Sequence, residues 1–107
     1  MESVKFFKAL SDPTRLRMVF LLTQRDELCV CHFTEVLGLP QSSVSRHLTT
    51  LRHAGLVSGR KEGVWIHYRL SVDDHSPFSA LVREIAALGE VEPILAGDIS
   101  RLAQARC

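Results

Sequence analysis

The spacing of apolar residues changes once along the chain, and the change separates a helical part from an extended part. Up to about residue 54, apolar side chains recur every three or four positions, which is typical of amphipathic helices. Between residues 56 and 70 they alternate with polar ones, which is typical of strands. The pattern predicts helices over residues 4–10, 13–23, 28–37 and 41–54, followed by strands over residues 56–60 and 64–70.

Residues with strong positional preferences mark where several helices begin and end. Asp12 is a good N-cap residue and Pro13 suits the first helical position, and Ser76-Pro77 repeats this arrangement before a further apolar run. Gly38 follows the third predicted helix, where glycine commonly ends a helix in the left-handed conformation. The segment 90–106 is also expected to be helical, with a break near Pro93.

The helix predicted over residues 41–54 has a polar side without any acidic residue. Val44, Leu48 and Leu51 recur at i, i+4 and i+7 on its apolar side. A solvated helix face usually mixes both signs of charge, whereas a face that meets phosphates and base edges avoids carboxylates. With the short glycine-containing turn before it, this segment is predicted to be the recognition helix of a helix-turn-helix.

The distribution of charge supports the same interpretation. The net charge of +1 does not by itself indicate a nucleic-acid partner. Residues 41–69, however, contain five basic side chains and one acidic side chain, while the rest of the chain is net negative. A basic central segment on a nearly neutral protein is expected of a small DNA-binding domain.

A β-hairpin after the recognition helix completes the predicted fold, which is mainly α with a small β-hairpin: a winged helix-turn-helix. The hairpin is expected to carry Arg60 and Lys61 at its tip, over a phosphate or the minor groove. Double-stranded DNA is therefore the predicted partner. The expected contacts come from Gln41, Ser42, Ser43, Ser45, Arg46, Thr49, Thr50, Arg60 and Lys61.

Two apolar helix faces are candidates for a dimer surface. At 107 residues the chain is expected to form one domain, and dimerisation would help so small a core. The first helix has a face of Val4, Phe7 and Leu10, which suits core and dimer interface equally. The stripe after Ser76 is more typical of a dimer surface than of extra core, and it contains Phe78, Leu81, Val82, Ile85 and Leu88.

Several function classes lack support in the sequence. No apolar run approaches the roughly 18 residues of a membrane span, and Met1-Glu2-Ser3 does not begin a signal peptide, so a cytoplasmic protein without membrane contact is expected. There is no glycine-rich phosphate loop, no paired carboxylates and no nucleophile–base spacing, so neither an enzyme nor a catalytic cofactor is expected. Three cysteines are too few for a disulfide scaffold and are expected to be thiols.

Several segments together resemble one protein family. They are ALSDPTRL from residue 9, ELCVC from residue 27, SRHL from residue 45, LRHAGLV from residue 51, and RKEGVW and YRL in the hairpin. Over residues 7–70 the chain resembles the ArsR/SmtB family of metal- and metalloid-responsive bacterial repressors. The resemblance implies a homodimer that packs through its first and last helices, binds a palindromic operator and is released by an inducer.

The resemblance also implies an inducer site at Cys29 and Cys31. Arsenite-responsive members place thiolates in an ELCVC motif, so arsenite or antimonite is the expected inducer. One version of this motif adds a third cysteine three positions further on, where this chain has Thr34. The ligands that zinc sensors carry on their last long helix are missing, because His75 is the only histidine after the hairpin.

The chemistry of the cysteine pair agrees with this site. A helix N-terminus lowers the pKa of a thiol, and thiolates select soft ions. Trivalent arsenic accepts two or three sulfurs, whereas zinc or cadmium normally takes four ligands, which Glu27 or His32 would not by themselves complete. In a regular helix, side chains at i and i+2 point about 160° apart, so joint binding would require the first helical turn to distort.

Cys107 and two alternative functions remain open at this stage. Cys107 is expected to be mobile at the chain end and is a possible third ligand, in its own subunit or across a dimer. The same cysteines would also suit a repressor that senses a divalent soft metal (cadmium, lead or zinc) or thiol oxidation. Because a disulfide between i and i+2 is strained, oxidation would join Cys107 to one of the pair. A winged helix that only mediates protein contacts is a further alternative.

Overall fold

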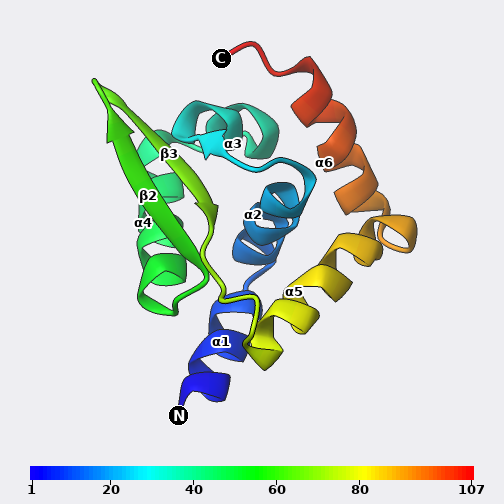
Figure 1. Cartoon of the computed structure of the whole chain (residues 1–107). Coiled ribbons are helices and arrows are strands. Elements are labelled where there is room, and N and C mark those ends of the chain that lie inside the picture. Colours follow the sequence, from blue (N-terminus) through cyan, green and yellow to red (C-terminus); the bar gives the residue numbers. More distant parts are fainter.

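The structure, a computed structural model, describes all 107 residues. The chain forms six α-helices, one 3₁₀ turn and three strands (Figure 1). None of the helices combines the length and the apolar character that crossing a membrane would need. The elements are α1 (Glu2–Leu10), α2 (Pro13–Gln24), β1 (Leu28–Cys29), α3 (Val30–Leu37), α4 (Gln41–His53), β2 (Val57–Glu62), β3 (Trp65–Leu70), α5 (Pro77–Ala86), η1 (Ala87–Glu90) and α6 (Pro93–Gln104).

The helix ends form where the sequence predicts them. The Asp12 carboxylate accepts hydrogen bonds from the N–H groups of Thr14 (2.8 Å) and Arg15 (3.1 Å) at the start of α2. Burial raises the pKa of Asp12, but these hydrogen bonds and the Arg15 charge outweigh it and lower the pKa below its ordinary value. At the other kind of boundary, Gly38 ends α3 with a φ of 66°.

The core is centred on α2, whose residues Met18–Leu22 are all buried. The apolar side of α4 packs into the same core as predicted, since Val44, Leu48 and Leu51 are fully buried. The outcome for the stripe on α5 differs from the prediction. Val82 and Ile85 are buried because α5 packs on α2, so the inner part of this stripe is core rather than dimer surface.

Other apolar side chains stay exposed on the helices away from the wing. On α1, Phe6 and Ala9 enter the core, whereas Val4 and Phe7 are half exposed. Helices α5 and α6 lie on the side of the molecule opposite the hairpin (Figure 1). The exposed large apolar residues of this C-terminal part are Leu81, Val91, Ile94 and Ile99.

A third strand, which the sequence pattern did not predict, precedes α3. Leu28 and Cys29 pair antiparallel with Tyr68 and His67 of β3, and α3 begins only at Val30. The prediction of a helix from residue 28 was therefore wrong by one short strand. The physical reason is that β1 satisfies backbone groups on the free side of β3, while the Leu28 side chain is buried in the core.

The wing is a regular hairpin that is longer than predicted. Strands β2 and β3 pair from Val57 with Leu70 as far as Glu62 with Trp65. The turn is formed by Gly63, with a φ of 62°, and Val64. Arg60 and Lys61 therefore lie within β2 next to the tip, rather than at the tip itself.

A buried carboxylate joins three helices. Asp98 of α6 is fully buried, and Arg17 of α2 binds it through two hydrogen bonds of 2.9 Å. The same carboxylate accepts from Arg101, whose Nε also donates to the Val36 carbonyl of α3 at 3.2 Å. Hydrogen bonding to Asp98 raises the pKa of Arg17. This network fixes α6 against α2 and against the end of α3.

Candidate nucleic-acid interface and thiol site

The outer face of α4 is accessible along its whole length. Arg46 and Thr49 are exposed near its centre, and Arg46 forms no ion pair in the structure. The Thr49 hydroxyl donates to the Ser45 carbonyl at 2.9 Å and keeps its lone pairs outward as acceptors. The other predicted contact residues of this helix are exposed (Gln41, Ser42, Thr50) or half-buried (Ser43, Ser45).

His47 faces the protein body and has a structural role, as the helical pattern predicted. Arg15 of α2 donates from Nη1 to His47 Nδ1 at 3.3 Å. The same guanidinium donates from Nε to the Ala9 carbonyl at 2.7 Å. This bridge ties the recognition helix to α2 and to the end of α1.

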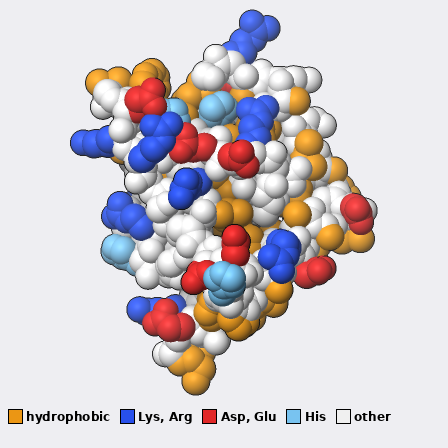
Figure 2. Space-filling view, viewed as in Figure 1, with side chains coloured by type: hydrophobic (Ala, Val, Ile, Leu, Met, Phe, Trp, Pro, Cys, Tyr) orange, Lys and Arg blue, Asp and Glu red, His pale blue; other side chains and the backbone are white.

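The two basic residues of the wing have different surroundings. Arg60 forms two hydrogen bonds with Glu27, at 2.7 and 2.9 Å, and one with Glu62 at 2.6 Å. These bonds hold the pKa values of both carboxyl groups below their usual range. Lys61 is exposed and forms no ion pair. Figure 2 shows the basic side chains on the wing side of the molecule, interspersed with carboxylates.

Cys29 is the N-cap residue of α3 rather than part of its first turn. Its backbone is extended, with φ −76° and ψ 155°, and its side chain is buried. The constraint expected of two cysteines in one regular helix therefore does not apply to it. Its N–H donates to Nδ1 of His32 at 3.0 Å, which is the capping-box position for a side-chain acceptor.

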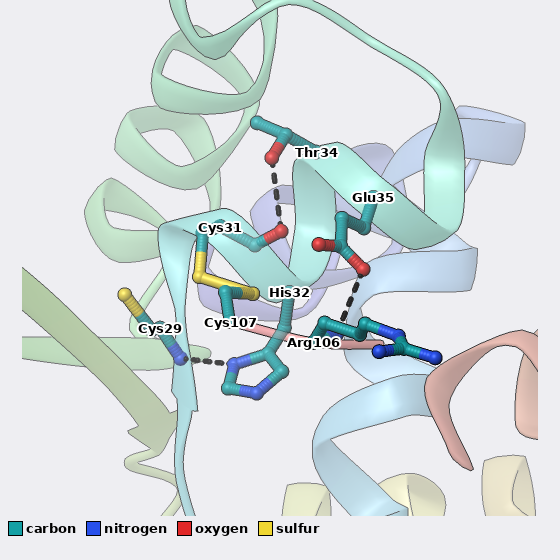
Figure 3. The surroundings of a disulfide bond; sticks show 7 residues. All are labelled: Cys29, Cys31, His32, Thr34, Glu35, Arg106 and Cys107. Carbon is teal, nitrogen blue, oxygen red and sulfur yellow. Dashed lines mark hydrogen bonds between the residues drawn. A yellow bond between two sulfur atoms is a disulfide. The ribbon is translucent and has the colours of Figure 1, made fainter. Parts of the chain in front are cut away.

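Cys107 is not mobile in the structure but bonded to Cys31 by a disulfide. Two of the three cysteines expected as thiols are thus oxidised, and only Cys29 is free. The pairing follows the expectation that oxidation joins Cys107 to one member of the pair. The C-terminal residues run back across α3, where the Arg106 N–H donates to the Glu35 carboxylate at 3.0 Å (Figure 3).

Three possible metal-binding side chains gather at the first turn of α3. The sulfurs of Cys31 and Cys107 and a ring nitrogen of His32 lie within 4.8 Å of one another. The Cys29 thiol is outside this group but lines the same pocket of about 380 Å³. Burial, followed by the charge of Arg25, lowers the pKa of His32, so the imidazole is neutral near pH 7.

The pocket connects the thiols to the wing. Trp65 and His67 of β3 form the wall opposite α3, and His67 is the strand partner of Cys29. Sequence reasoning identified the three cysteines but gave no role to His67 or Trp65. The signal that would have found them is the pairing of β1 with β3, which requires knowing that residues 28–29 are extended.

Comparison with known proteins identifies the family. Residues 12–58 match the family described as "Bacterial regulatory protein, arsR family". The chain is 39% identical over 98 residues to the arsenic resistance transcriptional regulator ArsR1 of Pseudomonas putida, an alignment that covers 92% of this chain and 75% of that protein. The chain belongs to the ArsR family. Members of this family are transcriptional regulators.

Two further ArsR-family comparisons agree on sequence and on shape. The arsenical resistance operon repressor of Escherichia coli is 50% identical over 68 residues, which are 64% of this chain and 58% of the repressor. The chain therefore matches little more than half the length of that relative. The structure of HlyU from Vibrio cholerae has a TM-score of 0.71 and 32% identity, covering 86% of this chain and 92% of HlyU. The resemblance to the family and the winged-helix fold are confirmed.

Proposed function

We propose that this ArsR-family chain represses transcription by binding operator DNA through α4 and the wing, and that trivalent arsenic or antimony releases it. The observation that carries the proposal is the convergence of three cysteines at the start of α3. The next helix exposes the acid-free face expected of a DNA reader. An inducer site and a DNA-binding surface thus lie on consecutive helices.

The inducer in this proposal binds sulfur from Cys29, Cys31 and Cys107. Reduction of the disulfide gives two thiols next to each other, and Cys29 lines the same pocket. Soft acceptors such as trivalent arsenic prefer thiolates, and three sulfurs complete a pyramidal site. Cys107 comes from the same chain, so the site does not require a partner subunit.

Induction in this proposal acts on both DNA-binding elements. The first turn of α3 leads through Gly38 into α4, and Cys29 is paired with the wing strand β3. A second link comes from Arg60, which joins the wing to Glu27, two residues before Cys29. Release requires the inducer to bind the DNA-free shape more tightly, and a tenfold loss of DNA affinity needs about 1.4 kcal/mol of coupling.

Replacing Arg46 and Lys61 is expected to separate the two ways in which the protein contacts DNA. Arg46→Ala should cost about 1–3 kcal/mol and relax specificity, because a base-edge contact is lost. Lys61→Ala should weaken all sequences alike and lower the salt slope by about one, because a phosphate contact is lost. Fluorescence anisotropy with a duplex selected from a random-sequence pool measures both effects. If both variants bind like the wild type, α4 and the wing are not the interface.

The functional form in this proposal is a symmetric homodimer. The support is the unpartnered apolar surface on the helices away from the wing, where Val4, Phe7 and Ile94 are each at least half exposed. Two recognition helices would then reach successive major grooves about 34–36 Å apart. Sedimentation of the reduced protein at micromolar concentration, without DNA, should give a dimer. A monomer under these conditions would contradict this arrangement.

Thiol oxidation is a second candidate signal, because the structure pairs Cys31 with Cys107. Hydrogen peroxide would take two electrons and two protons from the two thiols and leave water. The test compares operator affinity of the reduced and the peroxide-treated protein, with Cys107→Ser as the control that cannot form this bond. A change in the wild type alone supports oxidation sensing, and equal affinities exclude it.

A further inference from the structure

We propose that the reduced protein also binds a divalent ion of the zinc class through Cys31, His32 and Cys107, with Cys29 as the fourth ligand. The proposal rests on the proposed function, because it adds a second class of ion to the same thiol site. It also assigns a role to His32, which the arsenic site does not use. The argument depends on where the imidazole lies and on the hydrogen bond that it makes.

The first observation is the set of donor atoms. A ring nitrogen of His32 lies within 4.8 Å of the sulfurs of both Cys31 and Cys107. In a tetrahedral zinc site with zinc–sulfur bonds of about 2.3 Å, two sulfurs are about 3.8 Å apart. The donors therefore need to move by only about 1 Å to surround an ion. Cys29 lines the same pocket and supplies the fourth donor.

The chemistry of this set distinguishes two classes of ion. Three cysteines and one histidine form a common four-coordinate zinc site. Trivalent arsenic is satisfied by sulfur alone, so the imidazole is not needed for it. His32 is thus the residue that separates the two ions.

The second observation is that His32 already caps α3. The Cys29 N–H donates to Nδ1 of His32 at 3.0 Å, so Nδ1 carries no proton and the neutral ring carries its proton on Nε2. If Nδ1 binds the ion, its lone pair leaves the Cys29 N–H. If Nε2 binds the ion, the proton moves to Nδ1, which can then no longer accept.

Either route removes the capping hydrogen bond at the start of α3. The ion therefore exchanges a helix cap for a metal bond, in the residue that joins β1 to α3. Arsenic bound to sulfur alone leaves this cap in place. The two classes of ion are expected to produce different conformations at the start of α3.

The experiment uses the full-length protein after reduction by a trialkylphosphine. Each disulfide reacts with one phosphine and one water and gives two thiols and a phosphine oxide, which are removed under anaerobic conditions. Co²⁺ then reports the ligands, since a tetrahedral thiolate-rich site absorbs visible light. Competition with a chromophoric chelator gives the Zn²⁺ affinity.

Two matched variants locate the nitrogen ligand. His32→Gln keeps a side-chain acceptor at the capping position but removes the imidazole. His67→Gln removes the other histidine of the pocket, which is outside the donor group. We expect His32→Gln to weaken Zn²⁺ binding at least about tenfold and to shift the Co²⁺ spectrum, and His67→Gln to change neither.

The outcomes separate this proposal from the proposed function. Zn²⁺ binding by His32→Gln at wild-type affinity, or the absence of a tetrahedral Co²⁺ spectrum in the wild type, would overturn the zinc site. Arsenite binding is measured on the same variants and should be unchanged in His32→Gln. If arsenite fails to release DNA from the wild type while the Co²⁺ results are as expected, only the proposed function fails.

Discussion

Cys31→Ser is expected to bind operator DNA like the wild type and to lose its response to arsenite. Serine is nearly isosteric with cysteine, so α3 keeps its fold, but a hydroxyl does not replace a thiolate as a soft ligand. Cys31 is the central donor of the site because its sulfur lies beside both Cys107 and His32. In an operator-release titration, arsenite that lowers wild-type affinity tenfold should leave this variant unchanged.

The two other cysteines grade this prediction. Cys29→Ser should also repress without responding, since its thiol lines the same pocket. Cys107→Ser should keep a partial response, because two sulfurs remain for the ion. A Cys31→Ser variant that releases DNA at the wild-type arsenite concentration would show that another site binds the inducer.

Asp98→Ala is expected to lower the free energy of unfolding by about 3 kcal/mol. Removing one partner of a buried ion pair typically costs 3–5 kcal/mol. We expect the lower end because Arg17, although bound to Asp98 at two points, remains partly exposed and can turn toward water. Urea unfolding of the reduced protein measures the loss, and the melting temperature should fall by about 12 °C or more.

Two control variants test whether the buried charge is the cause. Asp98→Asn keeps the size and one oxygen acceptor, so its loss should be smaller. Ser100→Ala changes an exposed position of the same helix and should stay within about 0.5 kcal/mol of the wild type. All measurements use one protein concentration, because dimer formation would couple stability to concentration. Equal stability of Asp98→Ala and Ser100→Ala would contradict the role of the network.

The features predicted correctly from the sequence are those set by neighbouring residues. The Asp12 and Ser76 caps, the left-handed Gly38 and the buried face of α4 all depend on spacings of a few positions. The inward position of His47 follows from the same helical period, and the structure adds its bond to Arg15. Local preferences are sufficient for such features because both partners lie within one or two helical turns.

The features that were missed depend on residues far apart in the chain. Strand β1 has only two residues, and nothing near it indicates an extended conformation until β3 provides a partner. Cys107 was recognised as a possible ligand, but its place beside Cys31 depends on how α6 returns across α3. The pairing of Asp98 with Arg17 likewise joins residues 81 positions apart. No periodicity in the sequence reports such contacts.

The most direct test of the central claim is the affinity for operator DNA with and without arsenite, for the reduced wild type and for the Cys29→Ser/Cys31→Ser double variant. Anisotropy of a labelled duplex, chosen by selection from a random-sequence pool, gives all four dissociation constants at one salt concentration. We expect both proteins to bind DNA alike without arsenite, and arsenite to weaken only the wild type, by about tenfold or more. Full release of the double variant by arsenite would contradict the account, because the thiols at the start of α3 would then not be the inducer site.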